Sequence, residues 1–133
     1  MATPQLRCET DDDVTTLTGI LKQYLRDLSE PLLTFDAYPH FMEAYQLPDL
    51  ESRCKAMQPI IHQLPHGHQT TIRFLMRHWL NIHRAAAYNK MPSKNLAVVL
   101  GPNLMRTRDN DSGTEFMDMS SKNGVVELLI SQA

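Results

Sequence analysis

Lys22 and Arg26 are the two side chains in this sequence whose type and spacing best suit anion binding. They are four residues apart, so on a helix they lie one turn apart on the same side. Like charges at this spacing repel each other by roughly 0.2–0.5 kcal/mol, and a bound anion would relieve that repulsion. An ordinary solvated helix face that carries two cations is the competing interpretation.

A helix from about Asp11 to the residues before Pro31 must position this pair. Three adjacent aspartates, Asp11 to Asp13, suit a helix N-terminus because carboxylates stabilise the unpaired N–H groups there. Pro31 should end the helix, since the residue before a proline avoids helical backbone angles. Apolar residues recur at spacings of three and four, so one side of the helix is expected to be buried; these residues are Leu17, Ile20, Leu21, Tyr24, Leu25 and Leu28.

The same periodicity predicts further helices along the chain. Three segments have it: residues 35–45, residues 50–64 with Pro59 inside, and residues 72–84, where Arg73, Arg77 and Arg84 form a solvated stripe. A polar surface loop is expected from Arg106 to Glu115, followed by a last helix that Ser120 or Ser121 caps. The apolar run Leu96–Leu100 fits a buried strand or a buried helix equally well. An all-α fold, a helical bundle, is the best prediction.

The composition indicates one domain of ordinary size. The chain has 133 residues, of which 42% are apolar and 21% charged, and its formal net charge is −2. No global positive field would attract nucleic acid, and no apolar run is long enough for insertion into a membrane. We therefore expect a soluble, cytoplasmic protein whose two cysteines, Cys8 and Cys54, are free thiols rather than a disulfide.

Metal or enzyme chemistry finds no support in the motifs. Six histidines are present, but none has the HExxH spacing of a zinc site, and no CxxC pair occurs. The segment DNDSGTE, Asp109 to Glu115, begins like a calcium loop, but its glycine comes one place early and Ser120 stands where the last ligand belongs. We predict no metal site, no cofactor and no catalytic residue.

Two segments together resemble the signatures of a known family. KQYLRDLSEPLL, which contains Lys22 and Arg26, closely resembles KxYLRxLPxPLL of the Rho GTPase-activating protein (RhoGAP) domain. NLAVVLGPNL, from Asn95 to Leu104, resembles the NLAxVxGPxL signature of the same family. The resemblance extends from about Val14 to Ile130, and it favours a helix for the ambiguous Leu96–Leu100 run.

The resemblance implies a regulator that binds GTP-loaded Rho, Rac or Cdc-type small GTPases and is not itself an enzyme. GTP and magnesium would belong to the partner. Lys22 and Arg26 map onto the region that faces the GTPase, and Asn95 maps onto a residue beside that contact. Asn95 could instead be only a helix cap, and Asn103 only a turn residue after Gly-Pro. The predicted GTPase-binding residues are therefore Lys22, Arg26, Asn95 and Asn103.

One family feature has no counterpart in this sequence. RhoGAP domains carry an arginine finger in a G-[IL]-[FY]-R-x-S-G loop before the first signature, and the only arginine upstream here is Arg7, in QLRCE. The expectation is a poorly ordered lead at residues 1–12 and a partial RhoGAP domain at residues 13–133 that lacks the first helices. Such a chain would stimulate hydrolysis weakly or not at all, and it could dimerise through uncovered apolar surface. A non-catalytic helical adaptor with a RhoGAP-like scaffold is the alternative.

Overall fold

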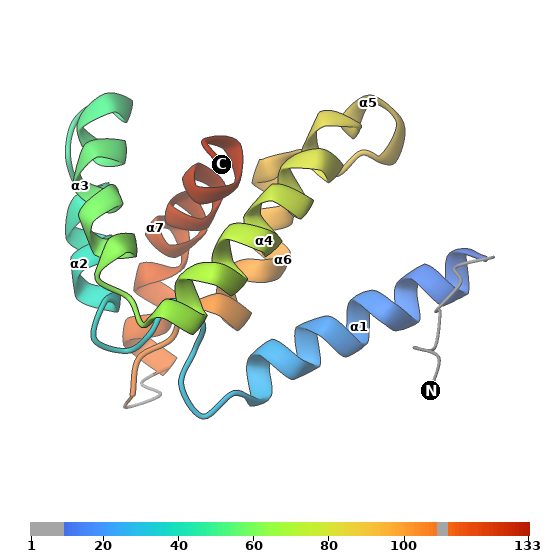
Figure 1. The fold of residues 1–133 in the computed structure, drawn as a ribbon, viewed down its shortest axis with the longest axis horizontal. Helices are drawn as coiled ribbons and strands as arrows, with labels where there is room; N and C mark the ends of the chain where they lie inside the picture. The colour runs from blue at the N-terminus through green and yellow to red at the C-terminus, as the bar shows by residue number, and fades with distance from the viewer. Residues whose placement is uncertain (1–9, 109–111) are drawn as a thin grey trace.

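The computed structural model describes residues 10–108 and 112–133, with side chains from residue 118 onward in the second range. This part of the chain is all helical, as predicted (Figure 1). Its helices are α1 (Asp11–Asp27), α2 (Tyr38–Tyr45), α3 (Leu50–His62), α4 (His66–Arg84), α5 (Ala86–Asn89), α6 (Ser93–Leu104) and α7 (Ser112–Ser131). None of these helices has the length and apolarity that crossing a bilayer requires. Residues 1–9 of the predicted lead lie outside the described residues.

Helix α1 starts where the aspartates indicated. Thr10 is its N-cap, and the Thr10 hydroxyl accepts a hydrogen bond from the Asp13 N–H at 3.2 Å. The Asp13 carboxylate accepts one in return from the Thr10 N–H, also at 3.2 Å, which completes a capping box. The helix ends at Asp27, four residues before Pro31. It stops early because Leu28 is extended, with φ −58° and ψ 134°.

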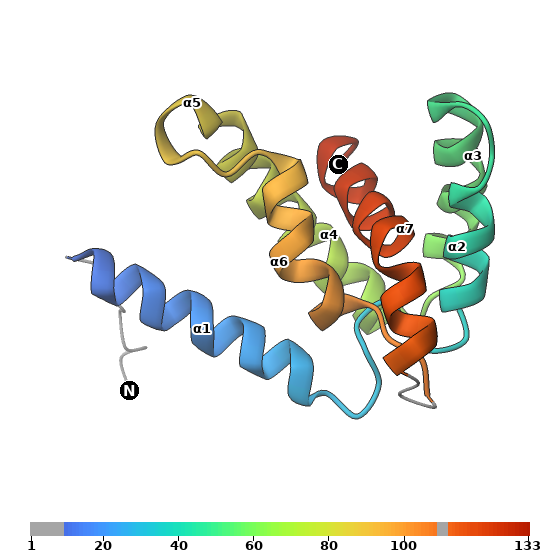
Figure 2. The same ribbon diagram turned by 180° about the vertical axis from the view of Figure 1, so that it is seen from behind.

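The prediction that one whole side of α1 is buried is wrong. Leu25 is 1% exposed, but Ile20 is 60% and Tyr24 is 63% exposed. The C-terminal turns of α1 approach α6, whereas its N-terminal turns stand apart from the rest of the described fold (Figures 1 and 2). Periodicity indicated an amphipathic helix correctly, but it could not indicate which turns another helix would cover.

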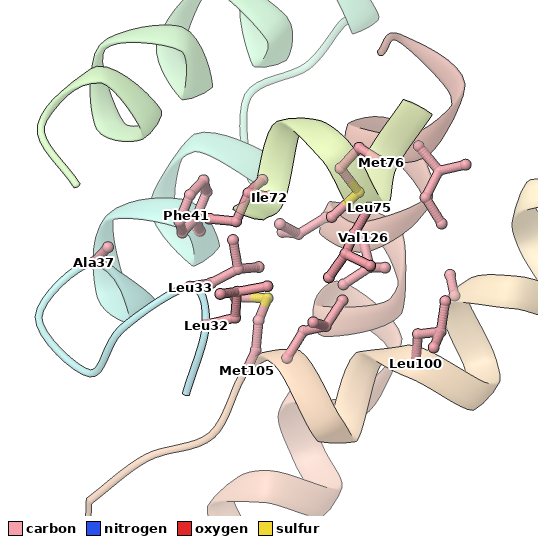
Figure 3. Packing of buried hydrophobic residues seen from close by; sticks show 14 of the residues in the cluster. Leu32, Leu33, Ala37, Phe41, Ile72, Leu75, Met76, Leu100, Met105 and Val126 are labelled. Atoms are coloured by element: carbon pink, nitrogen blue, oxygen red, sulfur yellow. The ribbon is translucent and has the colours of Figure 1, made fainter. Parts of the chain in front are cut away.

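The core forms where α4, α6 and α7 meet the segment that follows α1 (Figure 3). Leu33 and Phe41 are fully buried, and the Leu33 N–H donates a hydrogen bond to the Leu104 carbonyl at 3.2 Å. The PLL residues of the first motif therefore pack beneath the last turn of α6. The hydrogen bond from Leu33 to Leu104 thus fixes the segment that follows α1 against the end of α6.

The second motif and the last helix differ in part from the predictions. Leu96–Leu100 is helical, as the family resemblance implied, and α6 continues through Gly101 and Pro102 to Leu104. A methyl group at Gly101 would lie 2.7 Å from the Asn123 amide oxygen on α7. Glycine, which has no Cβ, therefore allows the two helices to approach closely. The predicted loop to Glu115 is wrong, because α7 already begins at Ser112. Its first turn, Ser112–Glu115, contains no large apolar side chain, so apolar spacing could not reveal it.

Candidate functional site

The two motifs meet through Arg26 and Asn103. Arg26 lies in the last turn of α1 and Asn103 near the end of α6, and the Arg26 Nε–H donates to Asn103 Oδ1 at 3.1 Å. Asn103 is only 2% exposed, and its Nδ2 donates to the Val99 carbonyl at 3.1 Å. Both ends of the amide group are therefore occupied, so Asn103 holds one edge of the guanidinium in a fixed position.

Arg106 strengthens this junction, and the sequence reasoning missed it. Its guanidinium donates to the Arg26 carbonyl at 3.3 Å and to the Leu28 carbonyl. Carbonyls at a helix C-terminus lack intrahelical partners and carry the negative end of the helix dipole, so a cation there is favourable. The only signal in the sequence was a cation shortly after the second motif, which is too common a pattern to identify such a role.

Lys22 lies one turn before Arg26 and is partly exposed. Within the described residues, no hydrogen bond or ion pair involves its ammonium group. The nearby Asp27 carboxylate accepts instead from the Gln23 amide at 2.8 Å. Lys22 and Arg26 thus place two positive charges on this part of the described surface, and neither is bonded to a carboxylate there. A site that binds an anion requires such unpaired positive charges.

Asn95 lies away from the Arg26–Asn103 contact. It is eight residues before Asn103 on the same helix, which corresponds to a rise of about 12 Å. Helices α1 and α6 converge at their C-terminal ends and diverge toward their N-terminal ends (Figure 2). The Asn95 side chain is exposed and donates to the Lys90 carbonyl at 3.2 Å, and Pro92, not Asn95, is the N-cap of α6. The helix-cap interpretation is therefore wrong.

The histidines that bond in the described chain contact the backbone. His68 Nδ1 lies 2.8 Å from the Leu32 carbonyl oxygen, and His83 Nδ1 accepts from the Ser93 N–H at 2.8 Å. Within residues 10–108 and 118–133, no three His, Cys, Asp or Glu side chains converge as metal ligands would. The whole segment considered as a calcium loop, Asp109 to Glu115, lies outside the described side chains. Cys54 is a free thiol, as predicted, and Cys8 lies outside the described residues.

Comparison with known proteins gives consistent results. The RhoGAP domain family model matches residues 3–109. N-chimaerin of Rattus norvegicus is 38% identical over 119 residues, which cover 90% of this chain and 36% of N-chimaerin. GTPase-activating protein pac-1 of Caenorhabditis elegans is 36% identical over 118 residues, 89% of this chain and 7% of pac-1. The chain therefore spans well under half the length of these curated relatives.

Two solved structures have the same fold. The BH domain from GRAF, the GTPase regulator associated with focal adhesion kinase, superposes with a TM-score of 0.86 and 31% identity. The match covers 97% of this chain and 68% of that one. Human Rho GTPase activating protein 15 gives a TM-score of 0.85 and 30% identity, over 97% of this chain and 62% of that one.

Proposed function

The chain belongs to the RhoGAP domain family, whose members activate Rho GTPases and are not themselves enzymes; we propose that it binds the GTP-loaded form of a Rho, Rac or Cdc-type small GTPase. The Arg26–Asn103 hydrogen bond is the observation that supports this proposal most strongly. It joins the two signature motifs, 77 residues apart, at one place on the fold.

Arg26 and Lys22 are the proposed contacts. Asn103 and the guanidinium of Arg26 share one hydrogen bond through Nε, so the remaining N–H donors of Arg26 are available to a carboxylate or phosphate oxygen. Because Asn103 and Arg106 restrain the end of α1, little conformational entropy is lost when these donors meet a partner. Lys22 adds a second, more mobile positive charge one turn away.

The two asparagines have different proposed roles. Asn103 is buried and its amide already bonded, so we assign it the positioning of Arg26 rather than direct contact with the GTPase. Asn95 is exposed on the opposite end of α6, so it would contact the GTPase at the edge of the interface. A GTPase surface that reached both Arg26 and Asn95 would span about 12 Å of α6.

The proposed effect on hydrolysis is small. In this reaction the GTPase supplies the nucleotide, the magnesium ion and the residue that orients the attacking water, and an arginine finger stabilises the transition state. The finger motif does not occur in these 133 residues. On their own, they would therefore bind and orient the GTPase while stimulating hydrolysis weakly or not at all. A cytoplasmic location remains part of the prediction.

A helical adaptor is the second candidate, and the missing finger motif favours it. An adaptor would bind its partner without regard to nucleotide state.

We also propose that the chain self-associates, since Val14, Ile20 and Tyr24 on α1 are 52%, 60% and 63% exposed. Exposed apolar side chains gathered on one element are typical of an interaction surface.

Two measurements test the main proposal. Binding of the chain to Rho, Rac and Cdc-type proteins should be compared among the GDP-loaded, GTP-analogue-loaded and transition-state-analogue-loaded forms. Preference for the GTP-like forms supports a regulator, and equal binding supports an adaptor. In a single-turnover assay, full acceleration of hydrolysis by these 133 residues alone would contradict the proposed weak stimulation.

A further inference from the structure

Helix α1 presents an apolar seam that no described part of the chain covers. Val14, Ile20 and Tyr24 are each more than half exposed, and Leu17 and Leu21 are partly exposed between them. Each residue of a helix is rotated by about 100° around the helix axis from the one before it, so residues two apart point in nearly opposite directions. Lys22 therefore lies on the side opposite Ile20, and Arg26 lies on the side opposite Tyr24. The seam is thus separate from the proposed GTPase contacts.

A groove of about 790 Å³ is lined by residues of α3, α4 and α7. These three helices lie on the other side of the described fold from most of α1 (Figure 1). Its apolar lining includes Met57, Ile61, Ile72, Met76, Leu128 and Leu129. Along α3 the lining extends from Leu50 to His62, a rise of about 18 Å. The α1 seam, from Val14 to Tyr24, rises about 15 Å, so the groove is long enough to hold it.

The charges of the two surfaces are complementary. Nine lysines and arginines, but no aspartate or glutamate, lie between Glu51 and Asp109 in the sequence. Three of them, Lys55, Arg73 and Arg77, line the groove, and neither arginine has an ion-pair partner among the described residues. At the groove's other wall, Glu51 is paired with Lys55 at 2.8 Å. Helix α1, in contrast, begins with three aspartates, Asp11 to Asp13, beside the exposed seam.

From these features we propose that the α1 seam of one molecule docks in the α3–α4–α7 groove of a second copy of this chain. This inference specifies the two surfaces of the self-association proposed above. Apolar side chains of the seam would fill the groove, and the acidic start of α1 would lie near Arg73 and Arg77. Reciprocal docking closes a dimer, whereas one-way docking builds longer assemblies.

Two variants separate the two surfaces. Ile20→Asp places a charge in the seam and leaves the groove intact, whereas Arg73→Glu/Arg77→Glu reverses the groove's charge and leaves the seam intact. All three residues are exposed, so both variants should fold, which their thermal melting would verify. Thr15→Asp, at an exposed position about 140° around α1 from Ile20, and Arg84→Glu, on α4 outside the groove lining, are the matched controls.

The readout is molar mass by sedimentation equilibrium over a concentration series. The natural chain and both controls should rise above the monomer mass of 15.2 kDa, and each surface variant alone should stay near it. An equimolar mixture of Ile20→Asp with the Arg73→Glu/Arg77→Glu variant should form a one-to-one complex, because one supplies the groove and the other the seam. A mixture that stays monomeric while the natural chain associates would overturn the proposed docking but leave self-association intact. A natural chain that is monomeric throughout would overturn both.

Discussion

Arg26 and Asn103 are joined by a 3.1 Å hydrogen bond, although 77 residues separate them in the sequence. Asn103 is buried and also bonded to the Val99 carbonyl, so the end of α1 has a fixed polar anchor on α6. Arg106 adds bonds to the carbonyls of Arg26 and Leu28. Arg26, the exposed cation in the last turn of α1, is therefore held in place by these interactions, whereas Lys22 has no such bond among the described residues.

Replacing Asn103 by alanine should destabilise the domain and weaken GTPase binding together. The change removes a buried amide and leaves the Arg26 edge and the Val99 carbonyl without their bonds, which should cost about 1–3 kcal/mol in the free energy of unfolding. Urea denaturation measures that cost. Arg26→Ala, at an exposed side chain, should reduce stability much less. A double-mutant cycle should give a coupling of at least about 0.5 kcal/mol, and additive effects would refute the anchoring role of Asn103.

Arg106→Ala should loosen the C-terminal turn of α1. Its guanidinium satisfies two carbonyls there, so the loss should be about 1–3 kcal/mol locally. Amide hydrogen exchange should show faster exchange in the last turn of α1 and in residues 28–30, with little change in α4. Arg108→Ala is the control, because Arg108 pairs with Asp36 at an exposed site and should contribute little. Equal exchange in the two variants would show that Arg106 does not anchor α1.

Gly124→Ala should destabilise the packing of α7 against α2. A methyl group there would overlap the Tyr45 ring, and relieving such overpacking typically costs about 1–3 kcal/mol. Gly19→Ala is the matched change on α1, where a methyl group meets no atom within 4 Å. At that exposed helical position alanine should stabilise by about 0.4–1 kcal/mol. Thermal melting should therefore shift in opposite directions for the two variants, and a Gly124→Ala variant as stable as the natural chain would contradict the packing.

Leu25 and Ile20, five residues apart on α1, should respond very differently to truncation. Leu25→Ala empties a buried position and should cost about 2–5 kcal/mol. Ile20→Ala removes a side chain that is 60% exposed. At concentrations where the chain is monomeric, its effect should therefore stay within about 0.5 kcal/mol. Chemical denaturation measures the free energy of unfolding of both variants. Similar losses at the two positions would mean that another part of the same chain covers the seam in solution.

Sequence reasoning recovered the helical fold because apolar periodicity and capping residues are local signals. The aspartates identified the start of α1, and the motif at Asn95–Leu104 identified α6 as a helix once the family was recognised. It missed the early start of α7, whose first turn has no large apolar side chain, and it expected burial at Ile20 and Tyr24. Covering a helix face depends on tertiary packing, which spacing alone does not encode.

The site was only partly predictable for the same reason. Lys22 and Arg26 were proposed from their spacing and motif, but the burial of Asn103 and the bonds of Arg106 depend on contacts between residues 77 to 80 positions apart. Asn95 and Asn103 occur in one motif, yet helical geometry places them at opposite ends of α6.

Lys22 and Arg26 are the residues that we propose bind a GTP-loaded Rho-type GTPase. Equilibrium binding of the natural chain and of Lys22→Ala/Arg26→Ala to a GTPase loaded with a non-hydrolysable GTP analogue tests this proposal most directly, with Arg73→Ala/Arg77→Ala as a charge-matched control. We predict that the first double variant weakens binding at least tenfold, about 1.4 kcal/mol, that its melting temperature changes little, and that the control binds like the natural chain. Unchanged affinity in the Lys22→Ala/Arg26→Ala variant, or an equal loss in the control, would contradict the proposal.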